Sequence, residues 1–323
     1  HRGNGMTWWG ADQEGQEAQF TVVSGVLAGQ IERSDSVLKI NFDASGDYSL
    51  GSARGSLKAG EVAPKAPCQT PRVPGVDLLA KSSSDVPGLE ASSETWRPVN
   101  KSGHATIDVA MVYTSKFESD YGGASGAPSQ VQAAVSYLER ALSKSGVNAG
   151  LRIVYSGVAS QLNGSSSLDQ LLDRAQNDTA IANLKNDYGA DVVLAAAARS
   201  EVGTGTCGLG YVLQSGNNSS NFSPFAFAAI SGWSACGLNE TLAHEVGHLL
   251  GLNHDPDNAS LVPSQAYRSY AYGHSKEGSW RTIMAYGFSL QTLQQFSDPT
   301  QSYQGIATVS YTHLTLPTMI IRC

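Results

Sequence analysis

The sequence predicts an α/β (α+β) domain over residues 104–308, with a small β-rich region before it. After residue 104, strand-like and helix-like segments alternate, which is typical of helices packed on a sheet. Before residue 58 the apolar segments are short, alternate with polar residues and carry no helical stripe, which indicates strands alone. A histidine-bearing helix follows the last strand of the α/β region and carries the clearest chemical signal.

The first 58 residues are predicted to be a separate β-rich unit, with strand patterns in QFTVVSGVLAGQIE and SVLKINFDASGDYSL. Because the chain begins HRGNGMTWWG, without an initiator Met, we expect this unit to be truncated at its N-terminus or already processed. Residues 59–103 hold half of the twelve prolines. Proline lacks a backbone donor and resists both helix and sheet, so this segment is predicted to be a linker that proteases can cut.

The α/β region contains the following predicted elements: strand 106–114, helix 129–146, strand 151–158, helical stretch 167–189, strand 190–198, and strand-like segments at 208–213 and 225–231. The first helix has apolar residues on one face and Gly146 as its stop. The second helical stretch is expected to break near Asn177. The strand at 190–198 is wholly apolar, so we expect it to be central and buried.

Charge and hydropathy argue against two classes of partner. The formal net charge is −7, whereas proteins that bind nucleic acid or membrane surfaces need a basic face. No run of eighteen apolar residues occurs, so no transmembrane helix is expected. The composition, low in Lys and rich in Ser, Gly, Asn and Thr, suits a secreted protein, in which disulfides persist. We therefore expect an extracellular monomer.

The last segment, VSYTHLTLPTMIIRC, fits none of the patterns before it. It resembles translated sequencing-adapter read-through, so residues 309–323 are set aside as a non-native tail, the alternative being a genuine final strand. Cys68, Cys207 and Cys236 then remain. Because this number is odd, two of them could pair and one would be left over.

The stretch HEVGHLLGLNHD, residues 244–255, is predicted to be a helix that carries metal ligands. We expect Asn239 as its N-cap and Gly251 as its left-handed terminator. His244 and His248 are four residues apart, so they share a helix face and can bind one metal ion. Gly251 lets the chain turn back and bring His254 as a third ligand. Three neutral nitrogen ligands leave one tetrahedral position open, which is the catalytic arrangement for Zn²⁺.

Glu245 follows the first histidine and lies about 100° around the helix from it, beside the metal rather than on it. There it can act as the base on a zinc-bound water, whose pKa falls to about 7. The alternative is a buried helix whose histidines only satisfy hydrogen bonds, as a lone histidine usually does. Three of the seven histidines at metal spacing, with Glu and Gly in place, favour the metal site.

The full pattern H-E-x-x-H-x-x-G-x-x-H resembles the zinc-binding consensus of the metzincin metalloproteases. TIMAYG downstream resembles the metzincin Met-turn, so Met284 is expected to pack beneath the three histidines, the alternative being an ordinary core methionine. Asp255 after the third histidine and Cys236 before the helix are similar to the reprolysin-like (adamalysin-type) branch. The resemblance covers about residues 104–308 and is closest to bacterial secreted peptidases of that branch.

This resemblance implies a metzincin-like catalytic domain with a twisted mixed five-stranded sheet, helices, a zinc cleft and an irregular part after Gly251. It implies a secreted zinc endopeptidase in which Glu245 activates a zinc-bound water to hydrolyse protein or peptide substrates. The substrate would add as a strand to the backbone of residues 209–212. Tyr286 matches an oxyanion-stabilising tyrosine of the astacin and serralysin branches, the alternative being a packing tyrosine. Asp255 is expected to anchor the turn near the Met-turn rather than to bind zinc.

The β-rich region, with its TWWG segment, resembles the pro-domain of these peptidases. Cys68 could then be a latent-state zinc ligand, as in the cysteine switch of matrix metalloproteases and reprolysins. Its surroundings, PKAPCQTPRVPG, have no Gly after the Cys and no obvious Arg–Asp pair, so a free or partnered linker cysteine is the alternative. Cys207 and Cys236 lie in the catalytic half, and the switch needs the Cys68 thiol free, so the expected disulfide joins Cys207 to Cys236.

Two other functions compete with a latent zinc endopeptidase. One is a catalytically inactive protease-like binding module, against which stands the presence of every expected catalytic residue. The other is a zinc hydrolase of a non-peptide bond, which the Met-turn disfavours.

Overall fold

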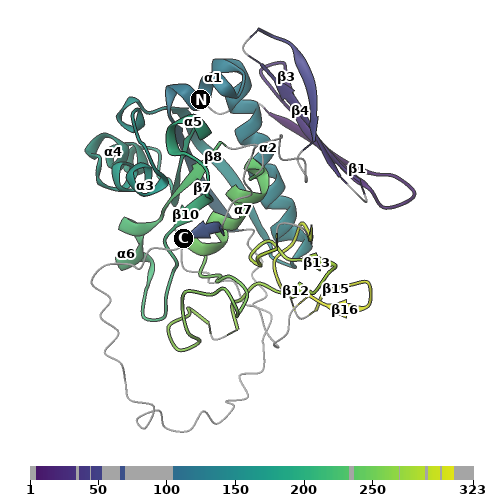
Figure 1. Ribbon diagram of the computed structural model, residues 1–323. Coiled ribbons are helices and arrows are strands. Elements are labelled where there is room, and N and C mark those ends of the chain that lie inside the picture. The colour runs from purple at the N-terminus through teal and green to yellow at the C-terminus, as the bar shows by residue number, and fades with distance from the viewer. Residues whose placement is uncertain are drawn as a thin grey trace.

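The computed structural model describes residues 5–33, 36–43, 45–52, 66–69, 105–232, 236–268, 270–287, 290–298 and 300–308. The predicted tail at 309–323 and the predicted linker, apart from residues 66–69, lie outside the described residues. Figure 1 shows a central sheet with helices on both faces and a second sheet that packs along one long helix.

The central sheet has six described strands in the order β6-β10-β11-β9-β7-β8. Their bounds are β6 (Ala66–Gln69), β7 (Ala105–Tyr113), β8 (Ala149–Val158), β9 (Val192–Ala197), β10 (Thr206–Gly210) and β11 (Phe227–Ser231). Every pairing is parallel except that of β10 with β11, so the sheet is mixed. The five strands expected of the α/β region are present, and every residue of β9 is buried as predicted.

Helices cover both faces of this sheet. On one face lie α2 (Gly123–Lys144) and α7 (Leu238–Leu249), and on the other lie α3 (Leu168–Asn177) and α4 (Thr179–Asp187). Side chains of β7 alternate between the two apolar cores, as the two-residue period of a strand requires. The predicted helix break falls at Asp178, whose side chain caps α4. The remaining short helices are α1 (Ser115–Asp120), η1 (Ser160–Leu162), α5 (Arg199–Val202), α6 (Ser219–Phe222) and η2 (Ser223–Phe225).

The N-terminal sheet is an antiparallel meander that rests on α2 (Figure 1). Its strands are β1 (Met6–Ala11), β2 (Glu17–Val23), β3 (Val26–Glu32), β4 (Val37–Phe42) and β5 (Tyr48–Ser52). Buried polar groups hold it there: Gln19 Nε2 donates to Ala133 O at 2.8 Å, and Ser129 Oγ lies 3.2 Å from Val23 O and 3.1 Å from Val26 O. The sheet is therefore docked by specific hydrogen bonds as well as by apolar contact.

One strand of the central sheet comes from the segment predicted to be linker. β6 pairs in parallel with β10, with Cys68 opposite Gly208 in the register. The expectation that this segment resists sheet is therefore wrong at residues 66–69. The physical reason is position: β6 is the edge strand, and an edge strand tolerates a proline such as Pro67 because one side of it needs no ladder partner.

The chain after α7 is irregular, as expected. Its described strands are the two-residue elements β12 (Ser275–Lys276), β13 (Trp280–Arg281), β14 (Gln291–Thr292), β15 (Ser302–Tyr303) and β16 (Ile306–Ala307). Gly251 has a φ of 91°, which suits its predicted role as helix terminator. The predicted N-cap is wrong: Gly237 precedes α7, and Asn239 instead donates from Nδ2 to Gln30 Oε1 of β3 at 2.7 Å.

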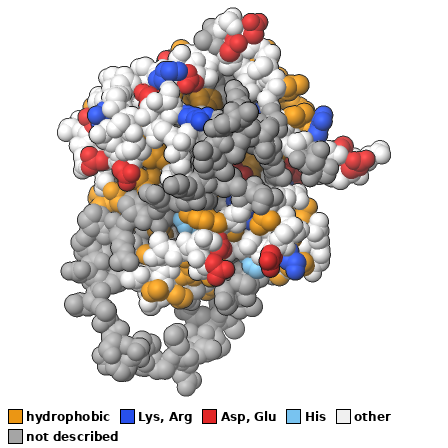
Figure 2. Space-filling model, viewed as in Figure 1, with side chains coloured by type: hydrophobic (Ala, Val, Ile, Leu, Met, Phe, Trp, Pro, Cys, Tyr) orange, Lys and Arg blue, Asp and Glu red, His pale blue; other side chains and the backbone are white. Residues whose placement is uncertain are grey.

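Within the described part of the chain, no helix is both long and apolar enough to cross a membrane. On the face shown in Figure 2, the acidic and basic side chains of the described residues are interspersed and form no continuous basic patch.

Candidate metal centre

The histidine helix α7 is buried between α2 and the central sheet. Leu242, Val246 and Leu249 are fully buried and belong to the apolar core on that side of the sheet. This packing fixes the rotation of the helix, so that His244 and His248 point away from the core residues and toward the chain that follows Gly251. His254 comes back to the same place after the turn, and all three imidazoles are buried.

Each of the three imidazoles is oriented by a backbone carbonyl. Nδ1 of His244 lies 2.8 Å from Ile283 O, that of His248 lies 2.7 Å from Leu252 O, and that of His254 lies 3.2 Å from Asn258 O. A carbonyl oxygen can only accept, so each Nδ1 carries the proton and each Nε2 keeps its lone pair. Backbone contacts of this kind fix the tautomer and ring orientation that metal-binding histidines need.

The three Nε2 atoms converge, but as acceptors they cannot donate hydrogen bonds to one another. The ligand nitrogens all lie within 4.8 Å of one another, and Nε2 of His248 is 3.0 Å from Nε2 of His254. His244 Nε2 is buried and has no hydrogen-bond partner. Two acceptor nitrogens in contact and a third left unsatisfied are costly unless a cation lies among them. These residues therefore fit a metal ion.

Burial keeps these side chains neutral, as metal ligands must be. Desolvation lowers the pKa of His244 and of His248 well below the ordinary value of 6.5, and the neighbouring histidines add to the effect. Desolvation also lowers the pKa of His254 to about 4, although its bond to Asn258 and the charge of Asp255 oppose the shift.

Glu245 points from the same helix toward the edge of the sheet. A Cβ on Gly208 would overlap its carboxylate, and one on Gly210 would lie 2.8 Å from its Oε2. The carboxylate therefore lies against β10, on the side of α7 next to the histidine face. The predicted base thus lies beside the histidines, at the strand expected to bind substrate.

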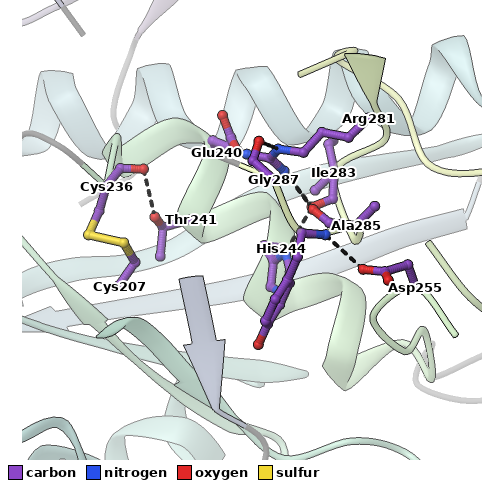
Figure 3. A network of polar contacts seen from close by, with 11 residues as sticks. Cys207, Cys236, Glu240, Thr241, His244, Asp255, Arg281, Ile283, Ala285 and Gly287 are labelled. Atoms are coloured by element: carbon purple, nitrogen blue, oxygen red, sulfur yellow. Dashed lines mark hydrogen bonds and ion pairs between the residues drawn. A yellow bond between two sulfur atoms is a disulfide. The ribbon is translucent and has the colours of Figure 1, made fainter. Parts of the chain in front are cut away.

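Met284 packs against the histidine helix, and Asp255 anchors the turn that carries Met284. Met284 is buried against Gly247, one residue before His248, where an added Cβ would overlap its sulfur. Asp255 Oδ2 accepts from the backbone N–H of Tyr286 at 2.8 Å and thus anchors the Met-turn, as expected (Figure 3). The ring of Tyr286 lies against that of His254 in a tilted contact, with 4.4 Å between the centroids.

A family model described as metallo-peptidase family M12 matches residues 103–297. The chain belongs to metallo-peptidase family M12. Family membership confirms the resemblance to reprolysin-like metzincins, and it establishes zinc as the metal of the family. The three buried histidines are the described group of residues that could bind it.

The M12 chain is similar in sequence to curated bacterial peptidases. It is 29% identical over 208 residues to a peptidyl-Asp metalloendopeptidase of Pseudomonas aeruginosa, covering 60% of this chain and 34% of that protein. It is 32% identical over 208 residues to one of Xanthomonas campestris pv. campestris, covering 62% and 46% respectively. The chain thus spans about a third to a half of the length of these relatives.

The fold of the M12 chain is also similar to a chain in a solved chaperone–substrate complex. The TM-score is 0.50 at 16% identity, over 88% of this chain and 36% of that one. At this identity, the similarity supports the fold alone.

The predicted disulfide of the M12 chain is confirmed. Cys207 of β10 is joined to Cys236 with a Cα–Cα distance of 5.3 Å, and Thr241 Oγ1 of α7 donates to Cys236 O at 3.1 Å (Figure 3). The bond therefore ties β10 to the start of the histidine helix. The backbone of Cys68 lies opposite Gly208 in β6, and its side chain is outside the described residues.

Two charged residues near the M12 site are absent from the sequence-based prediction. Glu240 of α7 forms an ion pair with Arg281, whose guanidinium also donates to carbonyls around Met284 (Figure 3). The two are 41 residues apart, and no motif links them. The one available signal is a glutamate four residues before His244, on the same helix face.

Proposed function

We propose that this M12 chain is a secreted zinc endopeptidase that its own N-terminal half holds latent. The observation that carries the proposal is the set of three buried histidines, each fixed through Nδ1 by a carbonyl, whose Nε2 atoms converge beside Glu245. His244, His248 and His254 would hold the zinc ion. The confirmed disulfide supports secretion, because disulfides persist in oxidising compartments.

Zinc, when bound, would polarise the scissile carbonyl and make a water molecule more acidic. Glu245 would accept the proton of that water and later pass it to the leaving amine. Its position against β10 supports this role, because a substrate paired with β10 would have its backbone next to the carboxylate. Tyr286, whose ring contacts that of His254, would donate a hydrogen bond from its phenol to the developing oxyanion.

The substrate is proposed to add as a strand to β10 and the residues after it, up to residue 212. β10 is the outermost strand of the catalytic region, so the side that β6 covers would offer a row of backbone donors and acceptors once β6 leaves. The curated relatives are named peptidyl-Asp metalloendopeptidases. Bonds next to aspartate are therefore the first peptide bonds to test.

Latency is proposed to come from β6. This strand pairs with β10 along the edge that the substrate would use, and its Cys68 lies opposite Gly208, the residue against which Glu245 packs. A strand in this position competes with a substrate strand for the backbone of β10. A thiolate from Cys68 on the zinc would close the remaining position.

Casein zymography tests activity and latency together. We expect chain cut within residues 70–103 to clear casein and uncut chain to remain silent, with all clearing lost when a chelator removes the metal. Cys68→Ser should give the uncut chain activity, because it removes the thiol while leaving the β6 backbone unchanged.

Each outcome of this assay separates the competing ideas. Absence of clearing by cut, zinc-loaded chain would favour the inactive binding module. Hydrolysis of ester or amide probes without cleavage of any peptide in a library would favour the non-peptide zinc hydrolase. An uncut Cys68→Ser chain as silent as wild type would reject the cysteine switch and leave the pairing of β6 as the block.

A further inference from the structure

A buried arginine next to the Met-turn has no part in the proposed mechanism. Arg281 lies three residues before Met284 and is 5% exposed. Its Nε donates to Gly287 O at 3.0 Å, its Nη1 donates to Ala285 O at 2.9 Å, and its Nη2 pairs with Glu240 (Figure 3). A buried charge is stable only when paired and hydrogen-bonded, and each nitrogen of this guanidinium has a partner.

The carboxylate partner of Arg281 belongs to the histidine helix. Glu240 precedes His244 by one helical turn, so both lie on the same face of α7. His244 Nδ1 donates to Ile283 O, the residue directly before Met284. The loop is therefore fastened to one face of α7 at two points, one turn apart (Figure 3).

Together these two contacts hold the loop on both sides of Met284. His244 holds the carbonyl of Ile283 before the methionine. Arg281, paired with Glu240, donates to the same carbonyl at 3.5 Å and to the carbonyls of Ala285 and Gly287 after the methionine. The loop can separate from α7 only if the His244–Ile283 hydrogen bond and the Arg281–Glu240 ion pair both break. Without the Glu240 fastening, the carbonyl that fixes the tautomer and rotation of His244 would move more freely.

We propose that Arg281 and Glu240 form a brace that positions the Met-turn, residues 282–287, and through Ile283 O the imidazole of His244. The brace rests on the proposed function, because it assigns His244 to zinc. Arginine suits it because the planar guanidinium donates in several directions at once, to three carbonyls and one carboxylate, whereas lysine is a point charge.

Zinc release from the full chain tests the brace. Zinc-loaded wild type, Arg281→Met and Glu240→Gln are mixed with a chromophoric chelator, and the rate of zinc transfer is recorded. We expect about tenfold faster release from both variants, since groups that orient metal-binding histidines typically contribute about 10- to 100-fold to metal affinity. The cobalt-substituted chain adds a spectroscopic test, because its visible absorption should change with the position of His244.

A matched control comes from the same chain. Arg152 pairs in bidentate geometry with Asp108, on β8 and β7 and apart from the Met-turn. Arg152→Met removes an arginine–carboxylate pair and should leave zinc release and the cobalt spectrum as in wild type. Equal acceleration in this control would mean a general loss of stability and would overturn the brace.

The remaining outcomes also decide the matter. Folded Arg281→Met with the wild-type release rate and cobalt spectrum overturns the brace. If Arg281→Met yields no folded chain, Arg281→Lys and Glu240→Gln decide: faster release supports the brace, and unchanged release in both overturns it. Wild type that binds no zinc refutes the proposed function and the brace with it, whereas zinc-binding wild type with unchanged variants refutes the brace alone.

Discussion

At the residue scale, the position of Glu245 depends on two residues that have no side chain. Gly208 and Gly210 alternate along β10 with Leu209, so both face α7 and leave room for the carboxylate. Neither has a positive φ, so space and not backbone freedom explains why glycine is needed here. A larger residue at 208 would push the carboxylate away from the histidines.

Gly208→Ala should therefore weaken catalysis without removing the metal. We expect kcat to fall about 100-fold, as misplacement of a catalytic group by about an ångström can do, while zinc stays bound. Peptide hydrolysis by linker-cut chain and zinc content are measured on the same preparation. Gly10→Ala is the control, since the Cβ of this strand glycine would meet open space. Full activity in Gly208→Ala would show that Glu245 does not need the space that a glycine at position 208 leaves for its carboxylate.

The sequence predicts the residues of the site with local spacing but not their distant partners. The three histidines, Glu245 and Met284 follow from a motif and a downstream turn. Arg281 and Glu240 form a buried pair across 41 residues, and the sequence does not indicate that this arginine would be buried. The carbonyls that hold each Nδ1 also come from loop geometry, which a motif does not contain.

At the element scale, β4 of the N-terminal sheet brings a lysine close to the brace. Lys39 lies half-buried next to the start of α7, where a Cβ on Gly237 would lie 3.4 Å from its Nζ. Burial lowers its pKa from 10.5 to about 8, and the charge of Glu240 only partly opposes the shift. The docked sheet thus holds a cation that would be better solvated after undocking.

This lysine makes stability depend on pH in a defined window. Between about pH 8 and 10.5 the unfolded chain keeps the Lys39 proton and the folded chain releases it, so the free energy of unfolding contributed by this group rises with pH. Lys39→Met should raise the midpoint of thermal unfolding at about pH 7 and reduce its rise toward about pH 9.5. Lys116→Met, at an exposed pair with Asp120, is the control. The same pH dependence in wild type and Lys39→Met would contradict the assignment.

Elements with a strong apolar period were predictable, and elements set by distant contacts were not. The strands at 105–113 and 192–197 and the helix break at Asp178 follow from local pattern. Asn239 looks like a cap in sequence, but the docked N-terminal sheet provides it with Gln30 as a partner. β6 forms despite Pro67 because an edge of the sheet is available to it.

At the scale of the whole molecule, the N-terminal half meets the catalytic half through its sheet and through β6. The β1–β5 sheet docks on α2 and contacts the start of α7, and β6 lies along β10 (Figure 1). A strand pairing of four residues is short, so we expect β6 to hold its place mainly while the N-terminal sheet remains docked. Latency would then end when the linker is cut and β6 can leave, as the proposal requires.

The predicted division at residues 58, 103 and 308 stays a prediction, since most of the linker and the tail lie outside the described residues. The mixed sheet and its helices follow from the order of the apolar segments. The pairing of residues 66–69 with the sheet does not follow from that order, because nothing in APCQ specifies a partner 140 residues away.

The central claim is that the three histidines bind zinc while Glu245 moves the proton. One measurement on linker-cut Glu245→Ala, zinc content together with peptide hydrolysis, tests it most directly. We expect one zinc per chain, as in wild type, with hydrolysis reduced by a factor of about 10² to 10⁴, the usual contribution of a general base. Undiminished hydrolysis by this variant, or loss of its zinc, would contradict these roles of the histidines and Glu245.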